Sequence, residues 1–229
     1  MWWLLFLPVV SGLEITTYLY GHTLEDVYCD PVSEPMSLYI PQGVTTIKHI
    51  SDCNIVYVYF QPSVEVIGNQ VFKDTNIISA DLASTNLKTI GEGAFSDCKS
   101  LETVTFPDTL ETIGQQAFYG CISLKTVTFP AGVDIKQQAF ESCTNLKTVT
   151  FSAGVKIGPF AFSSLEEATF LGDIPNQWDD SFGSLKHAYF ADDISQADRN
   201  AVCGDGCEQH DIPDECTSLS KKYAEECCS

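Results

Sequence analysis

Residues 113–129, IGQQAFYGCISLKTVTF, carry a pattern that recurs on both sides and decides the fold. The same spacing of Ile, Ala-Phe, Cys, Leu, Val and Phe occurs in IGEGAFSDCKSLETVTF at 90–106 and in IKQQAFESCTNLKTVTF at 135–151. Degenerate copies flank these three, so that phenylalanines 20 to 23 residues apart occupy one position at Phe72, Phe95, Phe118, Phe140, Phe162 and Phe182. A period of this length predicts a solenoid of stacked turns.

Each repeat contains a short segment that has the composition of a strand. In L-x-x-V-x-F, apolar and polar positions alternate and most residues are β-branched or aromatic, which favours an extended conformation. We therefore expect Leu101, Val104 and Phe106 to point inward, and Thr103 and Thr105 to point outward. A single repeat cannot bury its apolar side chains alone, because the packing partner of each is its counterpart in the next turn.

The repeats resemble the leucine-rich repeat, and specifically its BspA-type, or Treponema pallidum-type, class. The form I-x-x-x-A-F-x-x-C, followed by a strand and then by Pro107 or Pro130, carries this resemblance over residues 40–190. It implies an α/β-type solenoid, an arc with a short-stranded parallel sheet on its concave face and irregular or short helical segments on its convex face. It also implies a surface or secreted protein of a microbe or parasitic protist that binds host or neighbouring-cell molecules.

The ends of the repeat region depart from the pattern. PQGVTTI at 41–47 aligns with PDTLETI at 107–113, Thr75 replaces the cysteine of its repeat, and the segments after Phe162 and Phe182 lose three residues together with the cysteine. Terminal repeats are expected to be atypical because one of their faces meets a cap or water. We predict a signal peptide at 1–12, an N-terminal cap at 13–40, a solenoid of six to seven repeats of 20–23 residues at 41–190, and an acidic, cysteine-rich cap or tail at 191–229.

Composition and the N-terminal residues indicate a secreted protein. The apolar run from Trp2 to Val10, followed by Ser11 and Gly12, predicts a secretory signal cleaved near Gly12; a buried N-terminal segment is the alternative. No other run approaches the ~20 apolar residues that a membrane span requires. A net charge of −19 argues against nucleic acid or an anionic membrane as partner, because both are bound by clustered cations. The expected location is extracellular, in solution or at the cell surface.

The ten cysteines fall into two groups. Cys53, Cys98, Cys121 and Cys143 share the repeat position, where we expect small, buried and mostly reduced side chains; Cys29 is placed to bridge Cys53 and close the N-terminal cap. Secretion predicts disulfides for the tail cysteines as well. A zinc site formed by three of them and His210 is the weaker alternative, because the spacing matches no common zinc finger. An odd number of tail cysteines suggests a disulfide-linked dimer; they are Cys203, Cys207, Cys216, Cys227 and Cys228.

We expect the outward residues of the strands to form the partner-binding surface, on the concave face of the arc. Tyrosines are favoured interface anchors, because they bring large amphipathic area at low cost in entropy; threonine and tyrosine are also common in strands for purely structural reasons. The candidates, with an extracellular protein or glycan as ligand, are Tyr57, Tyr59, Asp81, Thr103, Thr105, Thr126, Thr128, Thr148, Thr150, Glu167, Thr169, His187 and Tyr189.

No motif in the sequence points to catalysis or a cofactor, and apart from the weak zinc alternative in the tail none points to a metal. The four histidines fall in unrelated contexts, and the sequence contains no nucleophile elbow, zinc-protease, P-loop or dinucleotide motif. We therefore predict a non-enzymatic, adhesion-like binding protein. The alternatives are a structural or self-associating extracellular protein and a scaffold for an effector tail. The three T-V-T triplets also resemble the threonine arrays of ice-binding solenoids, although those need a flat face and a leucine-rich arc is curved.

Overall fold

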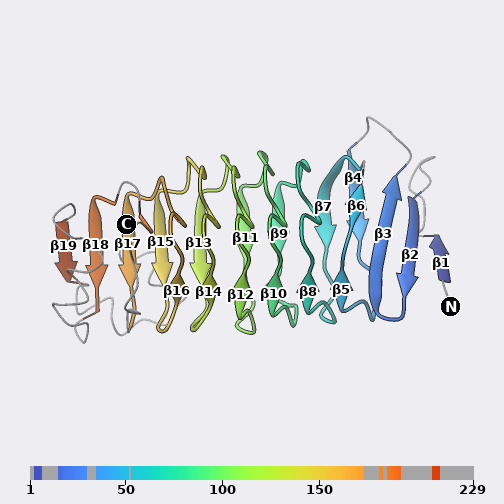
Figure 1. Cartoon of the computed structure of the whole chain (residues 1–229), viewed down its shortest axis with the longest axis horizontal. Helices are drawn as coiled ribbons and strands as arrows, with labels where there is room; N and C mark the ends of the chain where they lie inside the picture. Colours follow the sequence, from blue (N-terminus) through green and yellow to red (C-terminus); the bar gives the residue numbers. More distant parts are fainter. Residues whose placement is uncertain are drawn as a thin grey trace.

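The chain winds into a β-solenoid of about seven turns that contains two parallel sheets (Figure 1). The computed structural model describes residues 3–6, 15–29, 35–51, 53–172, 181–182, 185–191 and 208–211. Between residues 23 and 170 each turn contributes strands to both sheets, so the apolar side chains of both sheets meet in the space between them. The turns follow one another along the long axis of the molecule, from the N-terminal to the C-terminal end (Figure 1).

One sheet, which we call sheet A, has ten strands. Seven are only two residues long, and six of these, all but β6, end in the isoleucine with which the repeat motif begins. The N-terminal end of the sheet is an antiparallel hairpin of β2 and β3, to which β1 is added. The strands of sheet A are β1 (Trp3–Phe6), β2 (Ile15–Tyr20), β3 (Thr23–Cys29), β5 (Thr46–Ile47), β6 (Ile50–Ser51), β8 (Val66–Ile67), β10 (Thr89–Ile90), β12 (Thr112–Ile113), β14 (Asp134–Ile135) and β16 (Lys156–Ile157).

The other sheet, sheet B, has nine strands and is built from the L-x-x-V-x-F segments. Neighbouring strands pair in register, for example Val127 with Val149 and Phe129 with Phe151, so that equivalent residues stack. This pairing confirms the predicted parallel sheet of short strands. Its strands are β4 (Met36–Tyr39), β7 (Ile55–Tyr59), β9 (Ser79–Asp81), β11 (Thr103–Thr105), β13 (Thr126–Phe129), β15 (Thr148–Phe151), β17 (Glu167–Phe170), β18 (His187–Phe190) and β19 (Glu208–Asp211).

Two ladders of phenylalanine rings run through the core. In the ladder of the A-F motif, Phe95 stacks on Phe118 at 5.0 Å and Phe118 on Phe140 at 4.9 Å between ring centroids. In the ladder of the strand ends, Phe129 stacks on Phe151 at 5.5 Å. Stacked aromatic rings add attraction to the gain from burial, so the repeated phenylalanines bind each turn to the next.

Of the expected irregular or short helical segments, the helical form is wrong: no helix occurs in the described residues, and the A-F segments are turns. The backbone of the A-F segment bonds to the next turn instead, with Phe72 N donating to Ala94 O at 2.7 Å and Phe95 N to Ala117 O at 2.7 Å. A left-handed residue also recurs at the same position, as in Gln116 with φ 54°. Such residues interrupt any helix. The fold is therefore an all-β solenoid in which two-residue strands form a second sheet and the A-F segments that follow them are irregular turns.

Both ends of the chain contribute strands to the sheets. Residues of the predicted N-terminal cap form β3 and β4, which pair in parallel with β5 and β7. Within the predicted tail, β19 pairs in parallel with β18. Of the predicted signal peptide, only Trp3–Phe6 is described, and its cleavage stays a prediction. Within the described ranges, no helix is long and apolar enough to cross a membrane.

Candidate binding face

The outward side chains of sheet B form one continuous surface, which we call the binding face. Burial alternates along each strand, so that Val104 of β11 is buried whereas Thr103 and Thr105 are exposed. Strand pairing aligns the outward residues in two columns. The first column is Tyr57, Ser79, Thr103, Thr126, Thr148, Glu167 and His187, and the second is Tyr59, Asp81, Thr105, Thr128, Thr150, Thr169 and Tyr189. The structure thus brings all thirteen predicted contact residues onto one face.

The N-terminal end of the binding face is aromatic. Tyr39, Tyr57 and Tyr59 are 54%, 45% and 48% exposed, and the rings of Tyr39 and Tyr59 stack at 4.4 Å with an interplanar angle of 9°. Tyr39 was missed by sequence reasoning because it lies in the predicted cap. A usable signal was the alternation in Leu38-Tyr39-Ile40, which repeats that of Val58-Tyr59-Phe60. The two tyrosines stack because β4 and β7 pair with Tyr39 opposite Tyr59.

The centre of the binding face carries short hydroxyl side chains. Thr105 donates a hydrogen bond to Asp81 across the strands at 2.5 Å. A shallow hollow of about 340 Å³ opens over β11 and β13. It is lined by Thr103, Val104, Thr105, Phe106, Asp108, Thr126, Thr128, Phe129 and Pro130. Hydroxyl groups that both donate and accept therefore surround this hollow.

The C-terminal end of the binding face is less exposed than the tyrosine end. His187 and Tyr189 are half-buried on β18. The imidazole Nδ1 of His187 lies 3.4 Å from a carboxylate oxygen of Glu208, which is contributed by β19. The tail thus reaches the binding face at this end.

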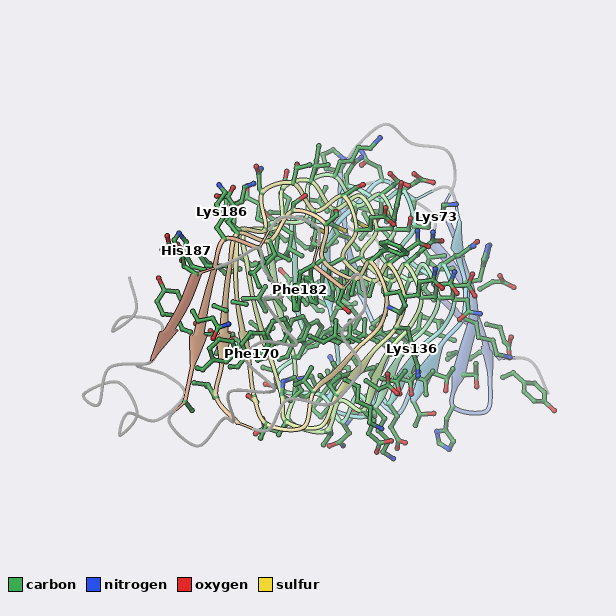
Figure 2. The ribbon with its side chains drawn as sticks, turned by 60° about the vertical axis from the view of Figure 1, so that its left-hand side comes forward. Lys73, Lys136, Phe170, Phe182, Lys186 and His187 are labelled. Carbon is green, nitrogen blue, oxygen red and sulfur yellow. The ribbon has the colours of Figure 1, made fainter. Side chains whose placement is uncertain are left out.

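A row of charged residues, which we call the charge ladder, borders the first column. Its members precede the strands and pair between turns: Lys125 with Glu102 at 2.7 Å, and Glu166 with Lys147 at 2.9 Å and with Lys186 at 2.6 Å. Hydrogen bonds from Lys186 and Lys147 lower the pKa of Glu166 to about 2. Figure 2 shows Lys186 and His187 on the outside of the solenoid, while Phe170 and Phe182 lie between the sheets.

The repeat cysteines form a buried ladder of free thiols, as predicted for three of them. Cys98, Cys121 and Cys143 are reduced and almost completely buried, and each Sγ donates to the phenylalanine carbonyl of the previous turn, at 2.9, 3.1 and 3.1 Å. Burial raises the pKa of Cys98 to about 11. Interaction with Cys143, followed by burial, raises the pKa of Cys121 as well. Burial shields all three thiols from reagents, and the raised pKa values of Cys98 and Cys121 also disfavour their nucleophilic thiolate forms.

Of the other cysteines, Cys53 is half-buried and disulfide-bonded. Its predicted pairing with Cys29 involves a side chain outside the described residues. The same is true of the predicted bridges of Cys203, Cys207, Cys216, Cys227 and Cys228. The disulfide framework and the disulfide-linked dimer remain predictions.

The chemistry of the described residues suits recognition. Among the residues for which the structure gives a position, no three histidine, cysteine or acidic side chains are grouped to hold a metal. The perturbed groups there are buried thiols and salt-bridged surface residues, and their surroundings explain the shifts without a reaction. Hydroxyls, phenols and a few carboxylates on rigid strands can bind a ligand by hydrogen bonds and ring contacts.

Comparison with known proteins agrees with the stacked repeats. The BspA type leucine rich repeat region, in six copies, matches residues 32–134, 66–183 and 133–229. The pneumococcal vaccine antigen PcpA has a similar fold, with 17% identity and a TM-score of 0.54 over 76% of this chain and 54% of PcpA, so that this chain spans about half of that protein. The T. pallidum leucine-rich repeat protein TpLRR is 19% identical, with a TM-score of 0.48 over 86% of this chain and 95% of TpLRR. A leucine-rich repeat protein from Bacteroides ovatus is 16% identical, with a TM-score of 0.46 over 90% of this chain and 67% of that one. No curated protein is significantly similar to the chain. The continuous match of the repeat across most of the sequence shows that this chain belongs to the BspA-type leucine-rich repeat family.

Proposed function

We propose that the protein is a secreted or cell-surface binding protein, adhesion-like in its role, which recognises a molecule of another cell or of the extracellular matrix through the binding face. The observation that carries this proposal is the continuity of the two outward columns, which begin in the exposed Tyr57 and Tyr59, with the exposed Tyr39 stacked on Tyr59. Exposed aromatic residues are costly to leave in water, and at interfaces they supply a large share of the binding free energy.

The comparisons support the proposed location. PcpA is described as a vaccine antigen, and a vaccine antigen has to be reached by antibodies. Members of the BspA-type family resemble binding scaffolds rather than enzymes. The antigen supports a surface location, and the family supports a non-enzymatic binding protein. The chemistry of the binding face determines which partner it can recognise.

Rigidity favours this face as the site of recognition. From β7 to β18 its residues lie on strands that pair on both sides, so little conformational entropy is lost when a ligand binds. The Tyr39–Tyr59 stack restrains two of the ring positions further. A preorganised row of side chains is a suitable surface for an extended ligand.

The test is binding of the secreted protein to intact cells and to immobilised matrix proteins. Two double variants remove the ends of the face: Tyr57→Ala/Tyr59→Ala and His187→Ala/Tyr189→Ala. The control Tyr20→Ala/His22→Ala removes the same residue types from the hairpin of sheet A, where Tyr20 is 57% exposed. We expect saturable binding that either face variant weakens and the control retains. Binding that survives both face variants would move the site to another surface.

The C-terminal tail is proposed to be a cap rather than an effector module. In support, β19 continues sheet B beyond β18, and Glu208 approaches His187. A solenoid end without such a strand exposes backbone hydrogen-bonding groups and apolar side chains. Deletion of residues 200–229 is expected to cause aggregation or unfolding. A soluble, folded deletion variant that no longer binds would instead favour an effector tail.

Two alternatives predict different results. A structural or self-associating protein would bind neither cells nor matrix and would form large species in sedimentation experiments. The ice-binding alternative predicts thermal hysteresis in dilute solution, with loss of the effect in a Thr126→Val/Thr128→Val variant.

A further inference from the structure

We infer that the hollow over β11 and β13 is the pocket in which the binding face anchors its partner, and that the anchor is an arginine side chain of a basic partner protein. This inference rests on the proposed function and adds the kind of partner and the residue by which it is held. Three features of the hollow lead to it: the break in strand pairing that opens it, its apolar floor and its charge.

The hollow opens where two neighbouring strands of sheet B stop pairing. β11 pairs with β13 through the single pair Thr103 and Thr126, whereas β13 and β15 pair along four residues. The same two turns are held in register again by Thr112 and Asp134 of sheet A. Between these two pairs the first turn has eight residues and the second has seven. The extra residue has no counterpart to pair with, so the strand ends diverge and leave a gap in the face.

The floor of the hollow is apolar, although it lies on an outward face. It is lined by Val104 and Phe106 of the first turn and by Phe129 and Pro130 of the second. Phe106 is only partly buried, whereas its counterparts Phe129 and Phe151 are 0% and 1% exposed. The divergence of the strands therefore leaves part of a core ring accessible. The methylene groups of a long, charged side chain can cover such a surface while the charged end stays at the rim.

The charge of the hollow favours a cationic anchor. Among the described residues that line it, Asp108 is the one that carries a charge, and it is exposed. A second carboxylate, that of Asp81, lies on the neighbouring strand and accepts a hydrogen bond from Thr105. A carboxylate offers about four acceptor sites, so it can accept from a ligand as well as from its own chain. The adjacent Lys125 is salt-bridged to Glu102 and therefore does not offset this negative charge.

Arginine fits these features better than lysine does. Its planar guanidinium can pack on an aromatic ring and bind a carboxylate through two parallel N–H groups, whereas the lysine ammonium is a strongly hydrated point charge. The hollow offers the ring of Phe106, the carboxylate of Asp108 and threonine hydroxyls that can accept the remaining N–H groups. Its volume of about 340 Å³ is at the lower end of the range for ligand pockets, about 300–1,000 Å³, which suits one long side chain.

The rest of the binding face suits a basic protein as the source of that arginine. The chain has a net charge of −19, which attracts a basic surface during association. Tyr57 and Tyr59 lie on β7, two strand steps from β11, which is roughly 10 Å at the usual spacing of strands. An interface of ordinary size covers about 800 Å² on each partner, so one protein can contact the tyrosines and also place an arginine in the hollow. Arginine and tyrosine are both enriched among the residues that dominate binding free energy.

The test is a titration of the isotopically labelled full chain with the tripeptide Ac-Gly-Arg-Gly-NH2, followed by amide chemical shifts in NMR spectra at physiological ionic strength. We expect saturable shifts around the hollow at millimolar concentrations of the tripeptide. The citrulline analogue keeps the length and the planar end of arginine but removes its charge, and it should bind at least about fivefold more weakly. The lysine analogue should also bind more weakly than the arginine tripeptide.

Two variants address the hollow directly. Asp108→Asn removes the negative charge and should weaken binding of the arginine tripeptide about five- to tenfold. Asp74→Asn, at an exposed aspartate on an A-F turn, is the matched control and should leave binding unchanged. Thr128→Tyr fills the hollow with a residue that strands accommodate well, and it should abolish binding. Thr169→Tyr makes the same change in the same column but outside the hollow, and it should retain binding.

The outcomes separate this inference from the proposed function. Binding to cells or matrix that Tyr57→Ala/Tyr59→Ala abolishes, but that Asp108→Asn and Thr128→Tyr retain, would overturn the arginine anchor and leave the binding face as the site. The anchor would also be overturned if the arginine tripeptide did not bind, if the citrulline or lysine analogue bound as tightly, or if Asp74→Asn weakened binding as much as Asp108→Asn. Selective arginine binding in the hollow, without any binding to cells or matrix, would support the pocket and contradict the proposed function.

Discussion

Phe118 lies at the centre of the longer phenylalanine ladder, and its replacement by alanine tests how the turns are held together. Its side chain is fully buried and its ring stacks on Phe95 at 5.0 Å and on Phe140 at 4.9 Å. Truncation of a buried phenylalanine to alanine costs about 3–5 kcal/mol. Because the ring also loses contacts with both neighbours, we expect Phe118→Ala to fall at the upper end, about 5 kcal/mol. Phe118→Leu keeps most of the apolar volume and should cost about 1–2 kcal/mol.

A double-mutant cycle tests whether the ladder couples only neighbouring turns. Phe95→Leu and Phe118→Leu remove two rings in contact, so their costs should deviate from additivity by about 0.5–1.5 kcal/mol. Phe72 and Phe140 lie three rungs apart, at successive centroid distances of 5.0, 5.0 and 4.9 Å. Their leucine variants should be additive within about 0.5 kcal/mol.

The assay is equilibrium unfolding in urea, followed by circular dichroism, with the free energy of unfolding extrapolated to water. Phe182→Ala is the comparison at the end of the ladder, where the ring is only partly buried, and it should cost less than Phe118→Ala. A cost below about 2 kcal/mol for Phe118→Ala would refute the reasoning. So would a coupling between Phe72 and Phe140 as large as that between Phe95 and Phe118.

Three further predictions concern the thiols, the backbone and the charge ladder. The native protein should not react with a thiol reagent such as DTNB at its three ladder cysteines, because all three side chains are buried, and burial also raises the pKa of Cys98 to about 11; reaction before unfolding at Cys98, Cys121 or Cys143 would show that these side chains are accessible in the folded protein. Ser142→Gly should raise the free energy of unfolding in urea by about 1 kcal/mol, because a left-handed residue, here at φ 62°, favours glycine, and Gly120 already occupies this position in the previous turn; Thr144→Gly is the destabilising control. The folded-state pKa of Glu166 is lowered from 4.5 to about 2, so its salt bridges should stabilise the protein fully above pH ~4.5 and lose this effect as the pH falls toward ~2. Glu166→Gln should flatten the pH dependence of the melting temperature over this range, and high salt should do the same in the wild type; an unchanged profile in the variant would show that the ladder contributes nothing measurable.

The alternation within each repeat was sufficient to place the binding face. Leu101 and Val104 face the core while Thr103 and Thr105 face outward, because successive residues of a strand point to opposite sides whatever surrounds them. The same rule applied to Tyr39 would have found it as well. It was missed because nothing within 36–39 shows that this short segment pairs with β7, which is a contact across about 20 residues.

The A-F-x-x-C segment illustrates the opposite case. Its apolar residues recur at intervals of three, a spacing that a helix also produces, so local pattern could not exclude helical turns. The structure resolves the ambiguity through hydrogen bonds that run from one turn to the next, such as Phe118 N to Ala139 O at 2.8 Å. These bonds exist only once the turns have stacked.

The sequence by itself determined the period, the identity of the core residues, the family and the composition of the outward surface, since each of these follows from residue type and spacing along one turn. Only the tertiary structure decided that the segments expected to be irregular or helical contain a second sheet and no helix in the described residues, that Tyr39 stacks on Tyr59, and that both predicted caps contribute strands to the sheets. The physical reason is that backbone groups and aromatic rings can bind partners that are distant in the sequence. A parallel stack of turns brings equivalent residues within about 5 Å of one another, and this proximity exists only in the folded chain.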